Sequence, residues 1–159
     1  MLGIVVFDGE CALCNGFVAW LVKHDRHNRY RIAGSAGDVG RAAIIAGGLS
    51  PDIAASTIVL VRGASALTKS DAVLTIASGL GWPWRAAAAA RVVPRSWRNR
   101  VYDAIAQRRA RVDADDAACG VPPAELVAAW RAKLATLDHV HVDASAQGKT
   151  PGRGGPRVS

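Results

Sequence analysis

The chain has 159 residues, half of which are hydrophobic, and a formal net charge of +7 at pH 7. This length suits a single domain, the composition excludes an intrinsically disordered chain, and three cysteines are too few for a secreted disulfide scaffold. No apolar run is long enough for a membrane span and the opening MLGIVVFDGE lacks a basic signal-peptide region, so we expect a cytoplasmic protein with reduced thiols.

The first 80 residues predict a β-α-β-α-β-β-α order of elements. The apolar or alternating runs predict strands at residues 2–7, 29–33, 56–61 and 65–69. The helical patterns predict helices at residues 11–25, 37–48 and 71–81, the last one capped by Ser70 and Asp71. A strand, a helix and a strand in succession form a parallel pair, and the later hairpin adds an antiparallel strand. The predicted fold class is therefore α/β, with a minimal thioredoxin-like core.

Residues from about 82 to 137 predict a C-terminal helical extension that caps this core. In it, Trp97, Val101 and Ile105 recur at helical spacing, which predicts a buried face. Eight of the sixteen arginines lie between Arg85 and Arg111, and a buried apolar face leaves them on the opposite, solvated side. Nucleic acid is therefore not an expected partner.

Core and extension are expected to form one domain over residues 1–143. The last residues, 144–159, are rich in glycine, serine and proline, and we expect them to form a disordered tail. No internal repeat divides the chain.

A cysteine pair, Cys11 and Cys14, falls where the first predicted strand meets the first predicted helix. Unpaired backbone N–H groups and the helix dipole stabilise a thiolate at a helix start. The spacing of three lets the two sulfurs reach bonding distance without breaking the helix. We therefore expect Cys11 to be the exposed nucleophile and Cys14 the buried resolving thiol, both acting in thiol-disulfide exchange.

Two carboxylates precede the pair, Asp8 and Glu10. Glu10 falls close to the helix start, where a negative charge suits the dipole. Asp8 ends the buried strand, and we expect it either to carry the proton that Cys14 loses or to form the turn that an Asp-Gly sequence favours. Asp8, Cys11 and Cys14 are thus the three candidate catalytic residues.

A metal-binding or redox-sensing module without turnover is the alternative function. It would use Cys11, Cys14 and Cys119, the third cysteine of the chain. His24 lies ten residues after Cys14, roughly 15 Å along a continuous helix, and cannot share an ion with it. Our expectation is a site with no metal and no cofactor.

The motif Asp8-x-x-Cys11-x-x-Cys14 is followed by KSDAVLTIASGLGWPWR and VPRSWRNRVYDAIAQRR, and then by Cys119. With these motifs in order, the chain resembles the DCC family of thiol-disulfide oxidoreductases over about residues 3 to 123. The resemblance implies a thioredoxin-like fold and an exchange activity on a disulfide. The partners would be a protein or small-molecule disulfide and a thiol electron donor. Because Ala12 and Leu13 add no positive charge between the cysteines, we expect the reducing direction.

Overall fold

The structure, a computed structural model, describes residues 2–107 and 124–141. The strands are β1 (Gly3–Phe7), β2 (Tyr30–Gly34), β3 (Val59–Arg62) and β4 (Ser65–Thr68). The α-helices are α1 (Ala12–His24), α2 (Asp38–Ala46), α3 (Lys69–Gly79), α4 (Arg95–Gln107) and α5 (Val127–Ala132). Three 3₁₀ helices are also described, η1 (Pro51–Ala55), η2 (Trp84–Val92) and η3 (Ala124–Leu126), and residues 137–141 are helical.

The four strands form one mixed sheet in the order β2-β1-β3-β4. Strands β1 and β2 are parallel, with Val5 opposite Ile32, because α1 carries the chain back between them. Strand β3 runs antiparallel to β1, and β4 returns antiparallel to β3 through a short turn. This topology confirms the predicted α/β, thioredoxin-like core.

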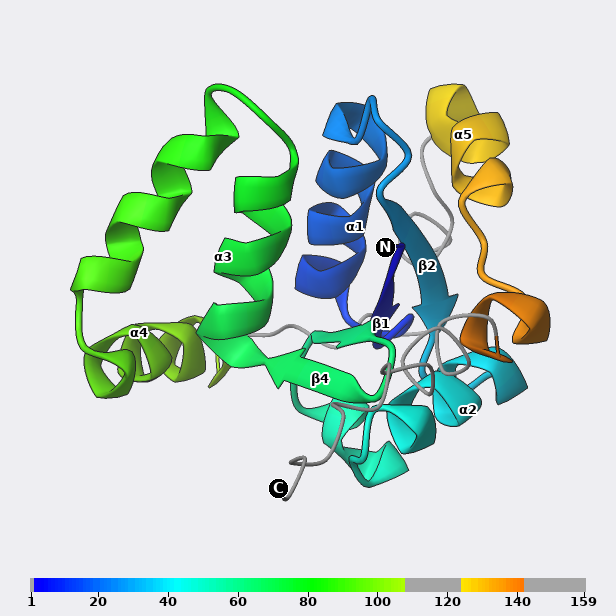
Figure 1. Ribbon diagram of the computed structural model, residues 1–159, viewed down its shortest axis with the longest axis horizontal. Coiled ribbons are helices and arrows are strands. Elements are labelled where there is room, and N and C mark those ends of the chain that lie inside the picture. The colour runs from blue at the N-terminus through cyan, green and yellow to red at the C-terminus, as the bar shows by residue number, and fades with distance from the viewer. Residues whose placement is uncertain (1, 108–123, 142–159) are drawn as a thin grey trace, which may run out of the picture.

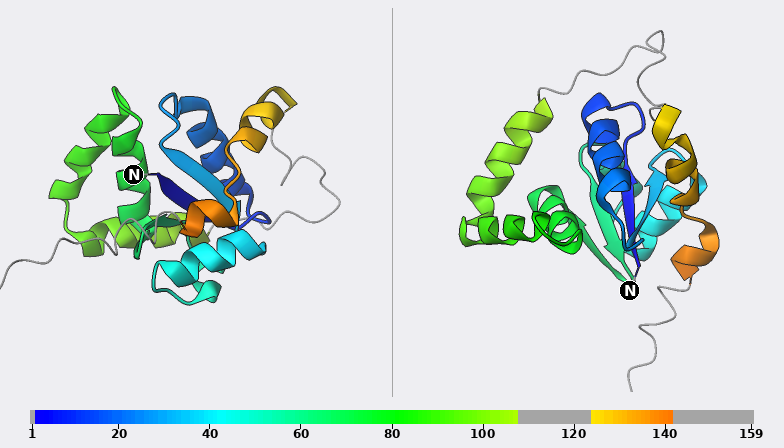
Figure 2. Two further views of the ribbon diagram at one scale, coloured as in Figure 1. Left: turned by 45° about the vertical axis from the view of Figure 1, so that its right-hand side comes forward. Right: turned by 90° about the horizontal axis from the view of Figure 1, so that it is seen from above.

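Side-chain alternation along β1 builds a core on each face of the sheet. Val5 and Phe7 point to the face that α1 and α3 cover, and Trp130 of α5 joins them there. Ile4 and Val6 point to the other face, which α2 covers. Because β1 is buried on both faces, its sequence is an unbroken apolar run. The result is a layered molecule in which η2 and α4 lie on the side opposite α5 (Figures 1 and 2).

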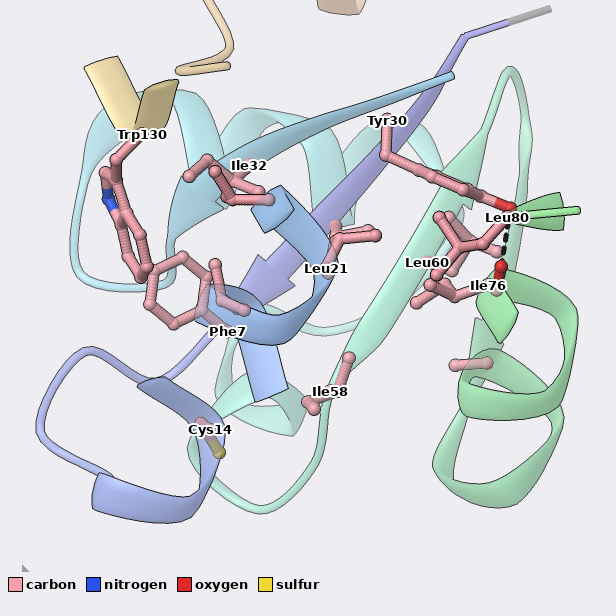
Figure 3. Packing of buried hydrophobic residues seen from close by; sticks show 14 of the residues in the cluster. Phe7, Cys14, Leu21, Tyr30, Ile32, Ile58, Leu60, Ile76, Leu80 and Trp130 are labelled. Carbon is pink, nitrogen blue, oxygen red and sulfur yellow. Dashed lines mark hydrogen bonds between the residues drawn. The ribbon is translucent and has the colours of Figure 1, made fainter. Parts of the chain in front are cut away.

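Tyr30 crosses the core from β2 to α3 (Figure 3). Its side chain is fully buried, and its hydroxyl donates to the carbonyl of Ile76 at 3.2 Å. The guanidinium of Arg62 donates to the same oxygen at 3.1 Å. Burial raises the pKa of Tyr30 above its ordinary value of 10.0, and this effect outweighs the nearby Arg62, which lowers it.

The segment after α5 completes the free edge of β2. Leu134 pairs in parallel with Ile32, whose amide donates to Lys133 O at 2.8 Å and whose carbonyl accepts from Ala135 N at 2.8 Å. The expectation of helix throughout residues 82–137 was therefore wrong at this point. An extended segment satisfies the backbone groups of an edge strand, which a helix cannot do.

A buried ion pair anchors the same segment at the end of α1. Lys133 Nζ lies 2.6 Å from Asp25 Oδ2, and the two side chains are 6% and 1% exposed. Asp25 also accepts the amide hydrogens of Arg29 and Tyr30, both at 3.0 Å. Backbone N–H groups as well as Lys133 therefore donate hydrogen bonds to its carboxylate. The extension is thus tied to the core by hydrogen bonds and charge as well as by Trp130.

The prediction that α4 buries one apolar face was wrong. That face comprises Trp97, Val101 and Ile105, which are 64%, 60% and 51% exposed. The polar side of α4 meets α3 instead, because Arg95 and Arg98 lie 2.6 and 2.8 Å from the two carboxylate oxygens of Asp71. Asp71, predicted to help cap α3, lies inside its first turn and holds these arginines.

Two further predictions concern membrane-spanning helices and the C-terminal part of the chain. No helix within residues 2–107 and 124–141 is both long and apolar enough to cross a membrane. The predicted tail, 144–159, and Cys119 lie outside the described residues.

Candidate active site

The loop from β1 to α1 places the cysteine pair at the end of a buried strand. Asp8 Oδ1 accepts the amide hydrogen of Glu10 at 2.9 Å, and the Asp8 carbonyl accepts that of Cys11 at 3.3 Å. These bonds form the tight turn that an Asp-Gly sequence favours. The carboxylate of Asp8 is therefore engaged with the loop backbone. Its predicted role as a proton carrier for Cys14 stays a prediction.

Cys11 is the N-cap of α1, which begins at Ala12. Its sulfur accepts the amide hydrogen of Cys14 at 3.3 Å, in the position that a serine or aspartate oxygen usually takes. A negative charge on this sulfur would face the unpaired N–H groups and the positive end of the helix dipole. The local geometry is therefore suited to a Cys11 thiolate.

Both cysteines are thiols in this structure and both are buried. Cys11 is 3% and Cys14 is 2% exposed, so the prediction of an exposed Cys11 was wrong. The reason is local, because the capping bond turns the Cys11 sulfur back toward the first turn of α1.

Asn15, which sequence reasoning missed, holds the loop from the helix side. Its Nδ2 donates to the carbonyl of Gly9 at 2.7 Å. This bond ties the residue after Cys14 to the turn before Cys11, and so fixes the segment that carries both sulfurs. A polar residue inside an otherwise apolar helix start was the available signal in the sequence.

A cavity of about 180 Å³ lies beside Cys14, the second cysteine of the pair. Its walls include Leu13, Cys14 and Phe17 of α1, Ile58 before β3, and Tyr102 and Ile105 of α4. The described residues that line it carry no charged group, so it favours apolar groups next to the Cys14 sulfur. Helix α4 was expected to act only as a cap, yet it forms one wall of the site.

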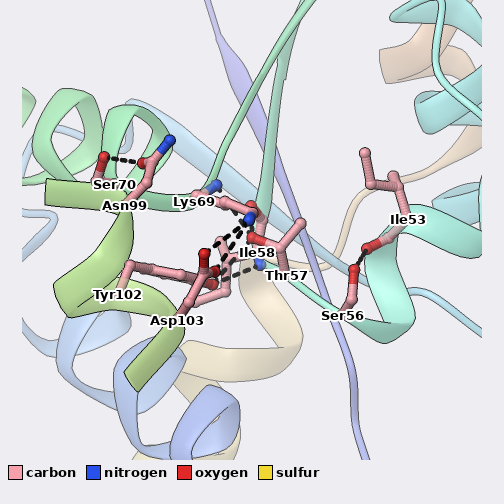
Figure 4. A network of polar contacts seen from close by, with 9 residues as sticks. All are labelled: Ile53, Ser56, Thr57, Ile58, Lys69, Ser70, Asn99, Tyr102 and Asp103. Atoms are coloured by element: carbon pink, nitrogen blue, oxygen red, sulfur yellow. Dashed lines mark hydrogen bonds and ion pairs between the residues drawn. The ribbon is translucent and has the colours of Figure 1, made fainter. Parts of the chain in front are cut away.

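A polar network holds that wall against the sheet (Figure 4). Tyr102 Oη accepts the amide hydrogen of Ile58 at 3.1 Å and lies 3.0 Å from Thr57 Oγ1. Lys69 pairs with Asp103 at 2.9 Å, and its amide donates to Thr57 Oγ1 at 3.0 Å. Because Lys69 has a φ of 53°, which few non-glycine residues adopt, this network holds a strained junction between β4 and α3.

No group of three metal-ligating side chains occurs within the described residues. His24 packs its ring at 5.1 Å from that of Trp84, and its Nδ1 lies 2.7 Å from Trp20 O. His139 Nδ1 accepts the amide hydrogen of Thr136 at 3.0 Å. Both histidines thus have structural partners, and the third cysteine of the alternative metal set, Cys119, lies outside the described residues.

Comparisons with known proteins show which family the chain belongs to. The chain is 30% identical over 106 residues to "Uncharacterized protein YuxK" of Bacillus subtilis (strain 168), covering 67% of this chain and 77% of that protein. It is 33% identical over 107 residues to the chloroplastic DCC family protein At1g52590 of Arabidopsis thaliana, covering 67% of this chain and 62% of that protein. No solved structure matches it significantly. The sequence model of one family matches residues 5–114, which include the loop and both cysteines, and the chain belongs to that family, the DCC1-like thiol-disulfide oxidoreductases.

Proposed function

We propose that this protein reduces disulfides, with Cys11 as the nucleophile and Cys14 as the resolving thiol. The observation that carries the assignment is the capping bond, in which the Cys11 sulfur faces the N-terminus of α1. The helix dipole and the amide of Cys14 can stabilise a negative charge on this sulfur.

The exchange takes place in two steps. The Cys11 thiolate attacks one sulfur of the substrate disulfide, forms a mixed disulfide, and releases a substrate thiolate that takes up a proton. Cys14 then loses its proton and attacks the Cys11 sulfur, which releases the second substrate thiol and leaves a Cys11–Cys14 disulfide. Two electrons have passed from the dithiol to the substrate, and a thiol electron donor returns them in a second exchange. Because Cys11 is buried, its sulfur must become accessible before the first step.

The reducing direction rests on the surroundings of the pair. Ala12 and Leu13 lie between the cysteines, and the described residues around the adjoining cavity are uncharged. Strongly oxidising dithiols owe their potential to extra stabilisation of the reduced, thiolate form. Because the described residues that line this cavity include no cation to supply it, we propose a potential closer to about −270 mV than to about −120 mV.

Trapping of the mixed disulfide tests the roles of the two sulfurs. Cys14→Ser should accumulate a mixed disulfide with substrate, seen as a mass increase by mass spectrometry, whereas Cys11→Ser should not. The reverse pattern would make Cys14 the nucleophile.

Equilibration of the wild-type protein with dithiothreitol buffers measures the potential, and a midpoint near the oxidising end would overturn the proposed direction.

Metal analysis of the purified protein addresses the alternative function. Stoichiometric zinc or iron, together with no reductase activity, would favour a metal-binding or sensing module over an exchange enzyme.

A cytoplasmic location remains our prediction from the sequence. It is tested by fractionating cells that contain the tagged protein.

A further inference from the structure

An apolar groove of about 390 Å³ lies on the side of the molecule formed by α3, η2 and α4. Its walls include Val73 and Leu74 of α3, Ala90 of η2, Val93, and Trp97 and Val101 of α4. The exposed residues of α4 that the sequence predicted to be buried thus line an open surface. Contiguous exposed apolar surface of this kind is typical of binding sites.

The groove adjoins the cavity beside Cys14, because the two share wall residues. Val73, Tyr102 and Ile105 line both, and Cys14 lines the cavity. A molecule that extends from the groove into the cavity would therefore reach the Cys14 sulfur of the dithiol. A small disulfide needs only the cavity, so the groove adds contact area that only a larger substrate can use.

The elements that form the groove carry more positive than negative charge. Their cationic residues are Lys69, Arg85, Arg91, Arg95, Arg98 and Arg100, against Asp71 and Asp103. Lys69 pairs with Asp103, and Arg95 and Arg98 share the single carboxylate of Asp71. The remaining positive charge favours an acidic partner.

These charges also argue against a second copy of the chain as the occupant. Two such faces would bring their arginines together, in a protein with a net charge of +7. We propose that the groove binds a polypeptide segment of the disulfide substrate, an apolar stretch next to the reacting cysteine with acidic residues beside it. This inference rests on the proposed function, since it names the substrate class of the same dithiol.

The test compares peptide disulfides with a small disulfide. The probe is a ten-residue peptide that has one cysteine linked to thionitrobenzoate between leucines, with glutamates at both ends. With a thiol electron donor present to reduce the Cys11–Cys14 disulfide after each turnover, release of thionitrobenzoate above the rate without protein gives kcat and KM. The reference peptide replaces leucine by serine, and the small substrate is cysteine linked to thionitrobenzoate. For the wild-type protein we expect KM to be about tenfold lower for the leucine peptide than for the serine peptide.

Val101→Ser should raise KM for the leucine peptide about tenfold and leave turnover of the small disulfide unchanged. Val101 lines the groove but not the cavity that holds Cys14. The matched control is Ile45→Ser in α2, because Ile45 is 61% exposed and Val101 is 60% exposed. Trp97→Gln provides a second groove variant. Equal KM values for the leucine peptide in wild type, V101S and W97Q would overturn the proposal.

Direct binding separates failure of the groove from failure of the enzyme. A fluorescent leucine peptide with serine in place of cysteine should bind wild type about tenfold more tightly than V101S by anisotropy. Such binding without any thionitrobenzoate release would support the groove and reject the proposed function. Release of thionitrobenzoate, with equal peptide binding by wild type and V101S, would support the proposed function and reject the groove. A wild-type dimer that V101S dissociates would assign the groove to self-association and overturn the proposal.

The charge of the peptide ends is tested in the same assay. Replacing the glutamates by lysines should weaken binding several-fold at low salt, and the difference should shrink at high salt because ions screen it. Equal binding of both peptides at low salt would reject the acidic character of the substrate.

Discussion

Gly79, the last residue of α3, packs directly against the hydroxyl of Tyr30. A Cβ built at Gly79 would collide with the Tyr30 oxygen, whereas one built at Gly16 of α1 meets nothing within 4 Å. We therefore expect Gly79→Ala to lower the free energy of unfolding by about 1–3 kcal/mol through overpacking. Gly16→Ala should raise it by about 0.5–1 kcal/mol, because alanine suits a helix better than glycine. Urea unfolding of both variants checks this, and an equal response would contradict the contact.

The buried phenol of Tyr30 makes stability depend on pH in the alkaline range. Its pKa is raised in the folded protein above the ordinary 10.0, so the folded state holds this proton longer than the unfolded state does. The stabilisation is complete below pH 10 and is lost as the pH rises through the folded-state pKa. In Tyr102→Phe, where Tyr30 is the remaining tyrosine, tyrosinate absorbance should appear with a midpoint above 10. A midpoint at or below 10 would contradict the burial.

The pair of Lys133 and Asp25 should contribute far more to stability than an exposed pair. Lys133→Met leaves the Asp25 carboxylate buried without its cation, and we expect a loss of about 3–5 kcal/mol in the free energy of unfolding. The exposed pair of Arg41 and Asp38, at 2.8 Å, is the control, and Arg41→Met should cost less than about 1 kcal/mol. Thermal and urea unfolding provide the comparison, and similar losses in the two variants would reject a structural role for Lys133.

Two substitutions of Asp8 separate its two candidate roles. Asp8→Asn keeps an oxygen for the Glu10 amide but removes the charge, whereas Asp8→Ala removes both. If Asp8 holds the loop, as its hydrogen bond indicates, only the alanine variant should lose stability, by about 1 kcal/mol. The rate at which Cys14 resolves the mixed disulfide, measured by stopped flow, should be unchanged in Asp8→Asn. A slower resolution step in that variant, at unchanged stability, would assign Asp8 the transfer of a proton.

The order of elements and the position of the dithiol could be predicted from the sequence because both depend on local patterns. The run from Gly3 to Phe7 is apolar and β-branched enough to be a strand in almost any surroundings, and Asp8-Gly9 ends it. The cysteine spacing then falls at a helix start without any knowledge of the rest of the fold.

The features that were mispredicted depend on partners far away in the sequence. The helical spacing of Trp97 and Val101 defines a face but not its neighbour, and the pairing of Arg98 with Asp71, 27 residues earlier, decides which side of α4 turns inward. The burial of Cys11 is the exception, because its cause is local: the side chain turns toward the amide of Cys14 at the helix cap. The contribution of Tyr102 to the site follows from a hydrogen bond across 44 residues, which no local pattern indicates.

The pairing of Leu134 beside Ile32 has a consequence for how the protein is made. The family match ends at residue 114, but the carboxylate of Asp25 meets its cation 108 residues later in the chain. A ribosome that adds about 5–20 residues per second delivers Lys133 about 5–20 seconds after Asp25. During that interval the edge of β2 has no neighbour from this segment, and the nascent chain presents an open strand to other chains and to chaperones. The part of the sequence that defines the family is therefore shorter than the part that must be synthesised before the β2 edge of the sheet is paired.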